Sequence, residues 1–489
     1  MPLEQYNRSD LYEKYGDKKV SESGIKGKFH FTDYMKDLDQ NVYFKFYVEI
    51  TFKYNNERTK FRSTRVHLNH LNNRFPLRKI ISYEGKKIKV QLKPTKKSKY
   101  LSFRLSNYNF KNEVIKKAKS SWIKFRRSKQ MKEVYKQAFY LLGKFPVRKK
   151  TVVFESFHGK QYSDSPRAIY EYMVDQKMDY DMYWSADRRH IEFFKEKPVK
   201  SVRRFSLKWL LLMSRAEYWV TNTRLPLWIP KPKHTTYVQT WHGTPLKRLA
   251  ADMEEVHMPG TNIEKYKRNF ITEANKWDYL ISPNAYSTEI FKRAFQFNKT
   301  IIESGYPRND FLINSNNQRI INQLRSNLDL PTDKKIILYA PTWRDNQYYE
   351  KGKYKFKLQM DLDMMKGQLC EKYIIILRLH YLVAENLDLT GYEGFVYNFS
   401  SHEDIRELYL IADILVTDYS SVFFDYANLK RPMLFFVYDI EEYRDKLRGF
   451  YFDFEEKAPG PLVKTTEDLI KEIENIDQNG FHPSKKIET

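Results

Sequence analysis

Cysteine is almost absent from this chain of 489 residues, which holds only Cys370. One cysteine cannot form a disulfide framework or a zinc site built on several thiolates, and it fits a reducing cytoplasm. Long apolar runs are also missing, because the longest, around residues 209–213, is far too short to span a bilayer. Residues 1–19 are polar throughout, so we expect no signal peptide. These absences predict a soluble or peripherally membrane-bound protein.

Several nucleotide-binding signatures are missing as well. The chain has no Walker A motif, no Gly-x-Gly-x-x-Gly, and no Asp-x-Asp pair placed as a metal clamp for a nucleotide diphosphate. Asp361 and Asp363 have that spacing, but they lie in a polar stretch with no strand before it. We therefore expect arginines and helix termini, rather than a metal ion or another cofactor, to neutralise bound phosphates.

Positive charge is abundant, with a formal net charge of +25. Such a balance implies a polyanionic partner, which would be nucleic acid, an anionic membrane surface or a phosphate-rich substrate. The length predicts two to three domains. We expect a polar tail, a β-rich accessory domain, a basic amphipathic helical linker and two α/β lobes, at residues 1–26, 27–110, 111–150, 151–315 and 316–489.

Residues 27–110 alternate β-branched or aromatic residues with polar ones, which is typical of a small antiparallel sheet. In residues 111–150 the apolar side chains recur at helical spacing among many lysines and arginines. A basic, aromatic amphipathic helix suits the surface of an anionic membrane. A solvated linker helix that packs one face on a domain would show the same sequence pattern. Residues 202–215 repeat this basic and aromatic composition.

From residue 150 onward, short apolar strands alternate with helical segments. Near-continuous apolar strands of this kind form parallel sheets covered on both faces. We predict two Rossmann-like lobes with a cleft between them, and ligands at the carboxyl ends of the strands. The predicted strands are residues 151–156, 180–184, 218–222, 237–240, 335–340, 373–380, 411–417 and 432–437.

The turn Trp241-His242-Gly243-Thr244-Pro245 follows one of these strands, and a helical pattern begins at Leu246. A strand that ends in a glycine-containing turn before a helix presents backbone N–H groups to an anion. A histidine there could move a proton, because its pKa lies near neutrality. The alternative is a buried histidine that caps a turn.

Four further polar clusters end predicted strands or turns. Arg308, in Gly305–Asp310, suits a bidentate phosphate contact. Hydroxyls and free N–H groups at the start of a helix form a phosphate seat. The clusters contain Arg308, then Pro341 and Thr342, then Arg378 and His380, and finally Ser420, Ser421 and Asp425.

Together these motifs resemble the CDP-glycerol glycerophosphotransferase family of wall teichoic acid synthesis, over roughly residues 150–480. The likeness is greatest to its poly(glycerol phosphate) polymerases. It rests on residues 241–247, 304–310, 339–344, 378–380 and 417–425, with 430–432, 438–440 and 447–451. The resemblance implies a GT-B-type fold and a peripheral location at the cytoplasmic face of a Gram-positive cell membrane. It also implies transfer of glycerol phosphate from CDP-glycerol to the terminal hydroxyl of a lipid-linked chain, with release of CMP.

The resemblance also implies roles for residues. His242 would be the general base on the acceptor hydroxyl, and His380 would bind and polarise the donor phosphates. The remaining expected substrate-binding residues are Trp241, Gly243, Thr244, Pro245, Arg308, Pro341, Thr342, Arg378, Ser420, Ser421 and Asp425. The chain stops at Thr489, where relatives continue, so it is either a naturally short member or a truncated one. Residues 27–109 lie outside the shared core.

Other readings stay open at this point. Within the family, a primase or a CDP-ribitol enzyme would carry the same motifs, and homo-oligomers are possible. A GT-B glycosyltransferase that uses a sugar nucleotide is a further alternative. A nucleic-acid-binding protein is disfavoured, because no helix-turn-helix, RRM or zinc-finger pattern is present.

Overall fold

The computed structural model describes residues 4–6, 24–26, 42–46, 48–54, 57–63, 77–83, 85–94, 101–126, 128–256, 261–342, 348–350, 353–354, 358–379, 388–443 and 449–481. The chain divides into two compact units, residues 1–131 and 132–489. The division falls within the segment that the sequence suggested as a linker.

The first unit contains antiparallel β-structure, as its alternating pattern predicts. A four-stranded sheet has the order β3-β8-β7-β6, and two further strand pairs are β1-β2 and β4-β5. Helix α3 (Phe110–Arg126) follows the last strand. The strands are β1 (Glu4–Tyr6), β2 (Gly24–Lys26), β3 (Val42–Phe46), β4 (Val48–Tyr54), β5 (Glu57–Ser63), β6 (Leu77–Tyr83), β7 (Lys86–Pro94) and β8 (Leu101–Asn107).

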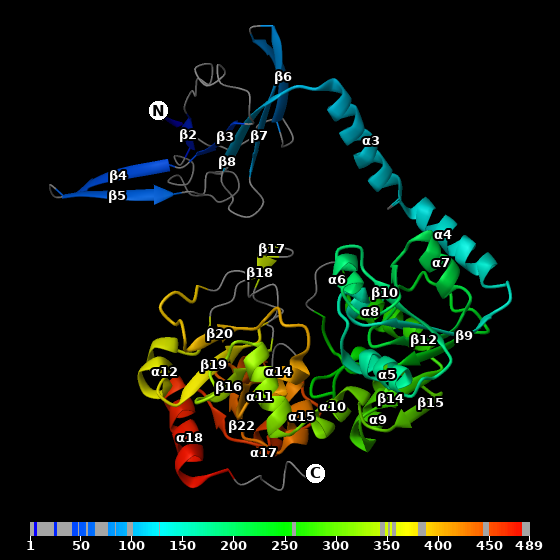
Figure 1. The fold of residues 1–489 in the computed structure, drawn as a ribbon. Coiled ribbons are helices and arrows are strands. Elements are labelled where there is room, and N and C mark those ends of the chain that lie inside the picture. The colour runs from blue at the N-terminus through cyan, green and yellow to red at the C-terminus, as the bar shows by residue number, and fades with distance from the viewer. Residues whose placement is uncertain are drawn as a thin grey trace. The chain divides into compact units, whose positions relative to one another are not determined.

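The second unit contains two parallel sheets (Figure 1). The first lobe, called the N-lobe, has the strand order β11-β10-β9-β12-β13-β14-β15. Its first strand, β9, is therefore internal, and the order reverses between β9 and β12. This is the dinucleotide-binding order with one added strand. The strands are β9 (Arg148–Glu155), β10 (Asp181–Ala186), β11 (Ser201–Arg203), β12 (Ala216–Thr221), β13 (Thr236–Gln239), β14 (Tyr279–Ser282) and β15 (Thr300–Glu303).

The second lobe, called the C-lobe, repeats this topology with the order β20-β19-β16-β21-β22-β23. Its order reverses between β16 and β21. Its strands are β16 (Lys335–Tyr339), β19 (Tyr373–Leu377), β20 (Val396–Asn398), β21 (Ile414–Thr417), β22 (Met433–Phe436) and β23 (Leu462–Val463), and a separate hairpin joins β17 (Tyr348–Glu350) to β18 (Lys353–Tyr354). The predicted two-lobed α/β class, with Rossmann-like sheets, is confirmed.

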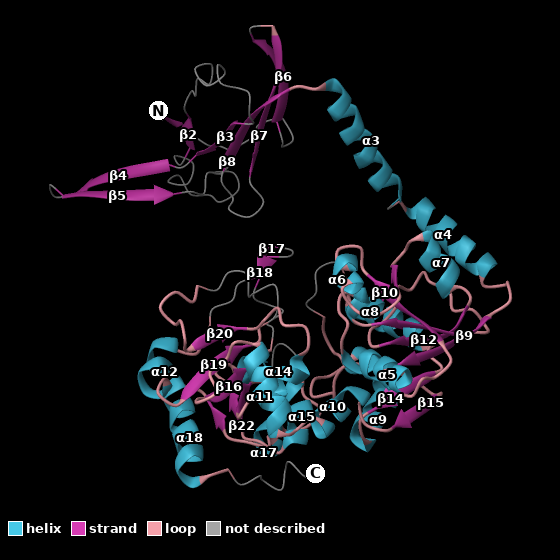
Figure 2. Cartoon of the chain, viewed as in Figure 1, coloured by secondary structure: helices cyan, strands magenta, loops and turns pink. Residues whose placement is uncertain are grey.

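Helices cover both faces of each parallel sheet (Figure 2). In the N-lobe, Val152 and Phe154 join one core cluster while Val153 joins the cluster on the opposite face. In the C-lobe, Ile336 and Ile337 divide between two clusters in the same way. Both faces of these strands are buried, which is why their sequences are almost continuously apolar.

The helices of the N-lobe are α4 (Lys129–Leu142), α5 (Asp164–Asp175), α6 (Ile191–Lys195), α7 (Leu207–Met213), α8 (Ile263–Ala274) and α9 (Ala285–Phe295). Those of the C-lobe are α10 (Asp310–Asn314), α11 (Gln318–Asn327), α12 (Leu362–Leu369), α14 (Ile405–Ile411), α15 (Val422–Tyr426), α16 (Ile440–Glu442), α17 (Phe454–Lys457) and α18 (Thr466–Asn479). In the described part of the chain, no helix has both the length and the apolar character needed to cross a bilayer.

The prediction of a helix from Leu246 is wrong. Residues 246–249 instead run beside residues 449–451, so their backbone groups bond across the lobes. Arg248 N–H donates to the Gly449 carbonyl at 2.9 Å, and Tyr451 N–H donates to the Leu246 carbonyl at 2.9 Å. Partners more than two hundred residues away thus replace the local i to i−4 bonds that a helix would need.

Candidate active site

The turn at residues 241–245 leaves the carboxyl end of β13. Trp241 begins it with a left-handed φ of 54°, and its N–H donates to Gln239 Oε1 at 3.0 Å. Its indole is buried and lies 4.8 Å from the ring of Phe295, measured between centroids. The core therefore fixes the start of the turn, and Trp241 anchors the residue that follows it.

His242 is the titratable group of this turn. Its Nδ1 lies 2.7 Å from the backbone carbonyl oxygen of Asn222, which can only accept a hydrogen bond. The proton of the neutral ring is therefore on Nδ1, and Nε2 keeps a lone pair. The ring is open to solvent, yet burial among protein atoms, with the charges of Arg308 and Arg224, lowers the pKa of His242 against opposing effects from Asn222 and Asp164. A neutral imidazole with a free Nε2 is suited to accept a proton.

The rest of the turn approaches the C-lobe. Gly243 lies so close to Ser421 that a Cβ atom added to the glycine would be 3.0 Å from Ser421 Oγ. Thr244 is buried, and the Pro245 carbonyl accepts a hydrogen bond of 2.7 Å from the Tyr286 hydroxyl. This stretch therefore brings His242 to the C-lobe edge that carries the predicted phosphate seat.

That C-lobe edge is the point where the strand order reverses. The loop after β16 contains Pro341 and Thr342, and the Thr342 N–H donates to Asp418 Oδ1, after β21, at 2.7 Å. Lys247 of the N-lobe approaches the Thr342 hydroxyl at 3.5 Å. Ser420 and Ser421 immediately precede α15, as predicted, and both are partly exposed. The structure thus brings together Gly243, Thr342, Ser420 and Ser421 from three separate motifs of the sequence.

Arg308 and Asp425 face each other rather than open solvent. Arg308 Nη2 lies 3.0 Å from both carboxylate oxygens of Asp425, and Nη1 lies 3.1 Å from Asp164 Oδ1. All three side chains are buried. Burial acts to lower the pKa of Arg308, but the two carboxylates raise it well above its ordinary value. We call this group the Asp164–Arg308–Asp425 triad. It joins α5 of the N-lobe to α15 of the C-lobe, and the substrate-binding role of Arg308 and Asp425 stays a prediction.

Arg378 also has protein partners. Its Nη1 donates to the carbonyl oxygens of Phe399 and Ser400 at 3.0 and 2.8 Å, and burial lowers its pKa. It therefore fixes the loop after β20 beside the predicted donor site. His380, two residues later, lies outside the described residues, so its expected contact with the donor phosphates stays a prediction.

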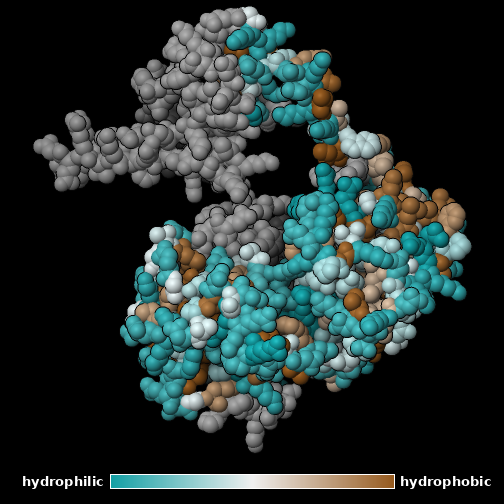
Figure 3. Space-filling model, in the orientation of Figure 1, coloured by the Kyte–Doolittle hydropathy of each residue, from teal (hydrophilic) through white to brown (hydrophobic). Residues whose placement is uncertain are grey.

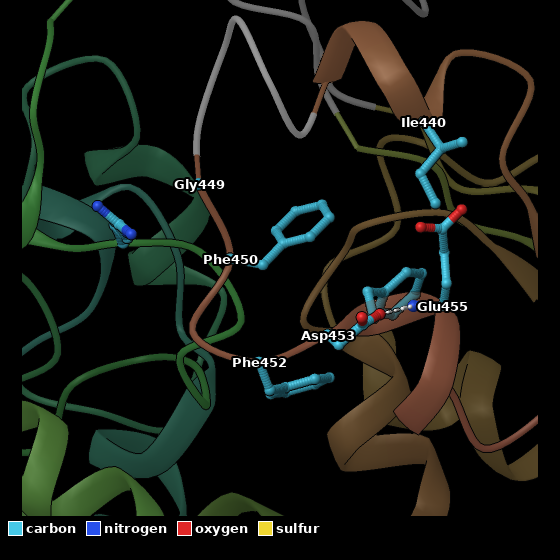
Figure 4. Close-up of a pocket in the computed structure, with 8 residues that line it drawn as sticks. Ile440, Gly449, Phe450, Phe452, Asp453 and Glu455 are labelled. Carbon is cyan, nitrogen blue, oxygen red and sulfur yellow. Dashed lines mark hydrogen bonds between the residues drawn. The ribbon is translucent and has the colours of Figure 1, made fainter.

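A pocket of about 300 Å³ lies beside the paired segments 246–249 and 449–451 (Figure 4). Arg248 of the N-lobe lines it together with residues from the end of the C-lobe. A Cβ atom added to Gly449 would lie 2.9 Å from Arg248 Nε, so the arginine side chain packs directly on this glycine. None of the predicted substrate-binding residues lines this pocket, so we do not assign the reaction to it. Its lining is Arg248, Ile440, Gly449, Phe450, Phe452, Asp453, Phe454 and Glu455.

The sequence prediction missed His158 and Arg224, which lie beside His242 at the carboxyl ends of β9 and β12. The Phe157 ring lies 5.9 Å from that of His242, measured between centroids, and after burial and Arg308 the charge of Arg224 also lowers the pKa of His242. A signal was present in the sequence: Phe157-His158-Gly159 follows its strand as Trp241-His242-Gly243 follows another.

Comparison with known proteins gives one family. A family model described as CDP-glycerol:poly(glycerophosphate) glycerophosphotransferase matches residues 137–489. The teichoic acid poly(glycerol phosphate) polymerase of Bacillus subtilis (strain 168) is 60% identical over 432 residues, which are 86% of this chain and 58% of that protein. The protein of the same name from Bacillus spizizenii (strain ATCC 23059 / NRRL B-14472 / W23) is 64% identical over 342 residues, which are 70% of this chain and 87% of the relative.

Among solved structures, a variant of the wall teichoic acid polymerase TagF soaked with CDPG superimposes with a TM-score of 0.68 at 46% identity. The match covers 78% of this chain and 92% of that one. The likeness therefore extends over both parallel sheets. The chain spans little more than half of the Bacillus subtilis relative and most of the Bacillus spizizenii one.

Proposed function

The chain belongs to the CDP-glycerol:poly(glycerophosphate) glycerophosphotransferase family, and we propose that it extends a membrane-linked poly(glycerol phosphate) chain. The donor is CDP-glycerol and the acceptor is the terminal hydroxyl of the chain. The observation that carries this proposal is the position of His242, whose free Nε2 lies in a turn that contacts the C-lobe phosphate seat.

The residues suggest the following reaction. The terminal hydroxyl of the acceptor gives its proton to His242 Nε2 as its oxygen attacks the phosphorus that carries glycerol. A new P–O bond forms, the P–O bond to the bridging oxygen breaks, and that oxygen leaves with CMP. The base matters because a neutral hydroxyl is a weak nucleophile. No step needs an external oxidant or reductant.

The donor phosphates would lie at the start of α15. Ser420 and Ser421 are partly exposed there, and the N–H groups of the first turn and the hydroxyls can stabilise negative charge as CMP departs. Lys247 approaches Thr342 from the opposite lobe and adds positive charge. We keep His380 and Arg378 as the expected contacts on the donor side.

A donor panel tests the function. Purified protein with a primed lipid acceptor should release CMP from CDP-glycerol and should not turn over UDP-sugars. Turnover of UDP-sugars alone would make the chain a glycosyltransferase. Because both named relatives polymerise glycerol phosphate, we expect CDP-glycerol to exceed CDP-ribitol as a donor.

Product length separates the roles within the family. We expect many additions per acceptor, which would identify a polymerase. One or two additions would identify a primase, and none would identify an inactive fragment. The length distribution on a denaturing gel gives the answer directly.

We also propose that the N-lobe binds an anionic membrane through α4 and α7. The Tyr135 hydroxyl donates to the Ser206 carbonyl at 2.9 Å, and Phe139 packs on Trp209, so the two helices form one surface. Figure 3 shows hydrophobic residues gathered over these helices. Large apolar side chains are exposed there beside Lys132, Lys144 and Lys208, namely Val134, Tyr140, Leu141, Phe145, Phe205, Leu207 and Leu211.

Exposed apolar groups beside lysines favour insertion into an anionic interface. Leu207 is 74% exposed, so Leu207→Glu should not disturb the core. We expect this variant to sediment less with vesicles that contain anionic lipid. The control is Ile313→Glu, at an exposed isoleucine on α10 of the C-lobe, which should sediment like the wild type. Equal sedimentation of Leu207→Glu and wild type would contradict membrane binding by this surface.

A further inference from the structure

A second aromatic-His-Gly turn lies beside the one that carries His242. It consists of Phe157, His158 and Gly159 and follows β9, whereas the His242 turn follows β13. The strand between them is β12. Both turns bond to the residues just after β12, because Asn222 accepts from His242 Nδ1 and Thr223 accepts from the His158 N–H at 3.3 Å. The two histidines therefore flank one short segment at the point where the strand order reverses.

The backbone of the second turn is strained, and hydrogen bonds to neighbouring residues fix it in this conformation. Phe157, His158 and Gly159 have left-handed φ values of 47°, 62° and 77°. The Phe157 N–H donates to Asn222 Oδ1 at 2.9 Å, and the Gly159 N–H donates to the Ser156 carbonyl at 2.9 Å. Such strain persists where the surrounding structure fixes it, and it concentrates at functional sites. The result is a His158 side chain on a fixed turn that reaches solvent although protein atoms crowd its ring.

Two arginines, Arg204 and Arg224, contribute positive charge at this histidine. The Arg224 guanidinium lies 4.2 Å from the centroid of the Phe270 ring. Among the described residues, no carboxylate forms an ion pair with it. Arg204 lies behind: its Nε is 2.9 Å from Glu155 Oε2, but its buried Nη2 has no hydrogen-bond partner in the described chain. Burial, with the charges of Arg204 and other cations, lowers the pKa of His158 to about 4. An anion between His158 and Arg224 would relieve this excess of positive charge.

We propose that His158 and Arg224, with Arg204 behind them, bind a phosphodiester of the acceptor chain next to the hydroxyl that His242 deprotonates. This inference rests on the proposed function. Neutral His158 would donate one hydrogen bond from its ring, and Arg224 would pair with the phosphate oxygens. Each round of addition creates the same phosphodiester beside a new terminal hydroxyl, so a subsite for that group recognises the acceptor at every length.

The first experiment measures binding without turnover. The probes are a soluble oligo(glycerol phosphate) and an oligoglycerol of equal length without phosphate, both titrated into the full chain in the absence of CDP-glycerol. We expect wild-type protein to prefer the phosphorylated probe, and Arg224→Gln and His158→Asn each to weaken its binding by roughly tenfold to a hundredfold. Arg268→Gln, at an exposed arginine on the helix that carries Phe270, is the matched control and should bind as the wild type does.

The second experiment compares substrates kinetically. For the phosphorylated acceptor, the two variants should raise KM by a similar factor, and their KM for CDP-glycerol should stay at the wild-type value. A raised KM for CDP-glycerol would assign the cations to the donor and overturn the proposal. Unchanged affinity for the phosphorylated probe in both variants would also overturn it.

The two proposals fail in different ways. If wild-type protein binds the phosphorylated probe, and the variants bind it less, while CDP-glycerol is not turned over, the subsite stands and the transferase function falls. If CDP-glycerol is turned over but the variants bind the probe as tightly as wild type, the function stands and the subsite falls. Thermal unfolding of each variant, beside Arg268→Gln, checks that the fold is retained.

Discussion

At the scale of single residues, the hydrogen bond from His242 Nδ1 to the Asn222 carbonyl determines which nitrogen can take a proton. A carbonyl oxygen accepts only, so it holds the ring in one tautomer and one orientation. Trp241, fixed in the aromatic core, holds the backbone that carries the ring. The ring is therefore oriented before any substrate arrives, which is what the proposed role of His242 as a base requires.

Replacing His242 by alanine should remove most transfer and leave the fold intact. We expect the rate of CMP release to fall by on the order of 10²–10⁴-fold, the usual contribution of a positioned base. Thermal unfolding should change little, because the ring is open to solvent. His190→Ala, at a histidine elsewhere in the N-lobe, is the control. A rate within a few-fold of wild type in His242→Ala would contradict the base role.

The pH dependence of kcat/KM should show the environment of His242. The ring acts as a base only when neutral, and it becomes protonated as the pH falls through its pKa. Because burial lowers that pKa from 6.5, the acid-side loss of activity should occur below pH 6.5. The limb should disappear from the residual activity of His242→Ala. An acid limb centred above pH 6.5 would show that the pKa is raised rather than lowered.

At the scale of elements, the turn after β9 shows how a glycine permits a strained loop. A Cβ atom added to Gly159 would lie 2.6 Å from the Ser185 carbonyl oxygen and 2.8 Å from the Asp187 nitrogen. Both are backbone atoms of β10 and the residues after it, so a side chain cannot be accommodated by a rotamer change. Gly305 has a similar φ of 81° but meets nothing within 4 Å. Substitutions at Gly159 and Gly305 therefore separate the cost of a left-handed backbone from the cost of steric overlap.

Gly305→Ala should cost about 1–2 kcal/mol of unfolding free energy, the price of a left-handed alanine. Gly159→Ala should cost this amount and about 1–3 kcal/mol more, because the turn or β10 must shift. Chemical denaturation of both variants measures the difference. Equal losses of stability would mean that the contact with β10 is relieved without cost.

Much of the element pattern was predictable from the sequence, and the failures have physical causes. Strands buried on both faces, such as β16 and β19, show as apolar runs because every side chain is in the core. The segment from Leu246 has a helical pattern but pairs with residues 449–451, and no local pattern shows so distant a partner. His158 was visible only as a repeat of the Trp241–Gly243 motif.

Site residues were harder to predict than strands, because a motif gives the residue type but not its partner. The sequence indicated Arg308 and Asp425 as ligand-binding groups. In the structure they bond to each other, and Arg308 also bonds to Asp164, which lies 144 residues before it. By contrast, Thr342 and Ser421 reach one edge as predicted, because both follow strands at the reversal of one sheet.

At the scale of the whole molecule, the Asp164–Arg308–Asp425 triad joins the two lobes. A second contact lies nearby, where Arg167 Nη1 bonds to Asp404 Oδ2 at 2.9 Å. Burial would raise the pKa of Asp404, but hydrogen bonds from Arg406 and the charge of Arg167 lower it. Buried charges of this kind are stable only while their partners are present. The ion pairs therefore make each lobe depend on the other.

Replacing Arg308 by methionine should leave two carboxylates buried without their cation. We expect a loss of about 3–5 kcal/mol in unfolding free energy, the usual result of breaking a buried ion pair. Arg319→Met, at an exposed arginine of α11, should change stability by less than about 0.5 kcal/mol. Urea denaturation at neutral pH compares them. If Arg308→Met were as stable as Arg319→Met, the triad would not hold the lobes together.

The pairing of residues 246–249 with 449–451 has a consequence for motion. When two bodies rotate about a seam, points beside the seam travel least and points far from it travel most. His242 lies four residues from that seam, so any opening or closing of the lobes would leave the base almost stationary while the outer loops swing. If the lobes rotate about this pairing, substrate entry and product exit would therefore move the proposed base least.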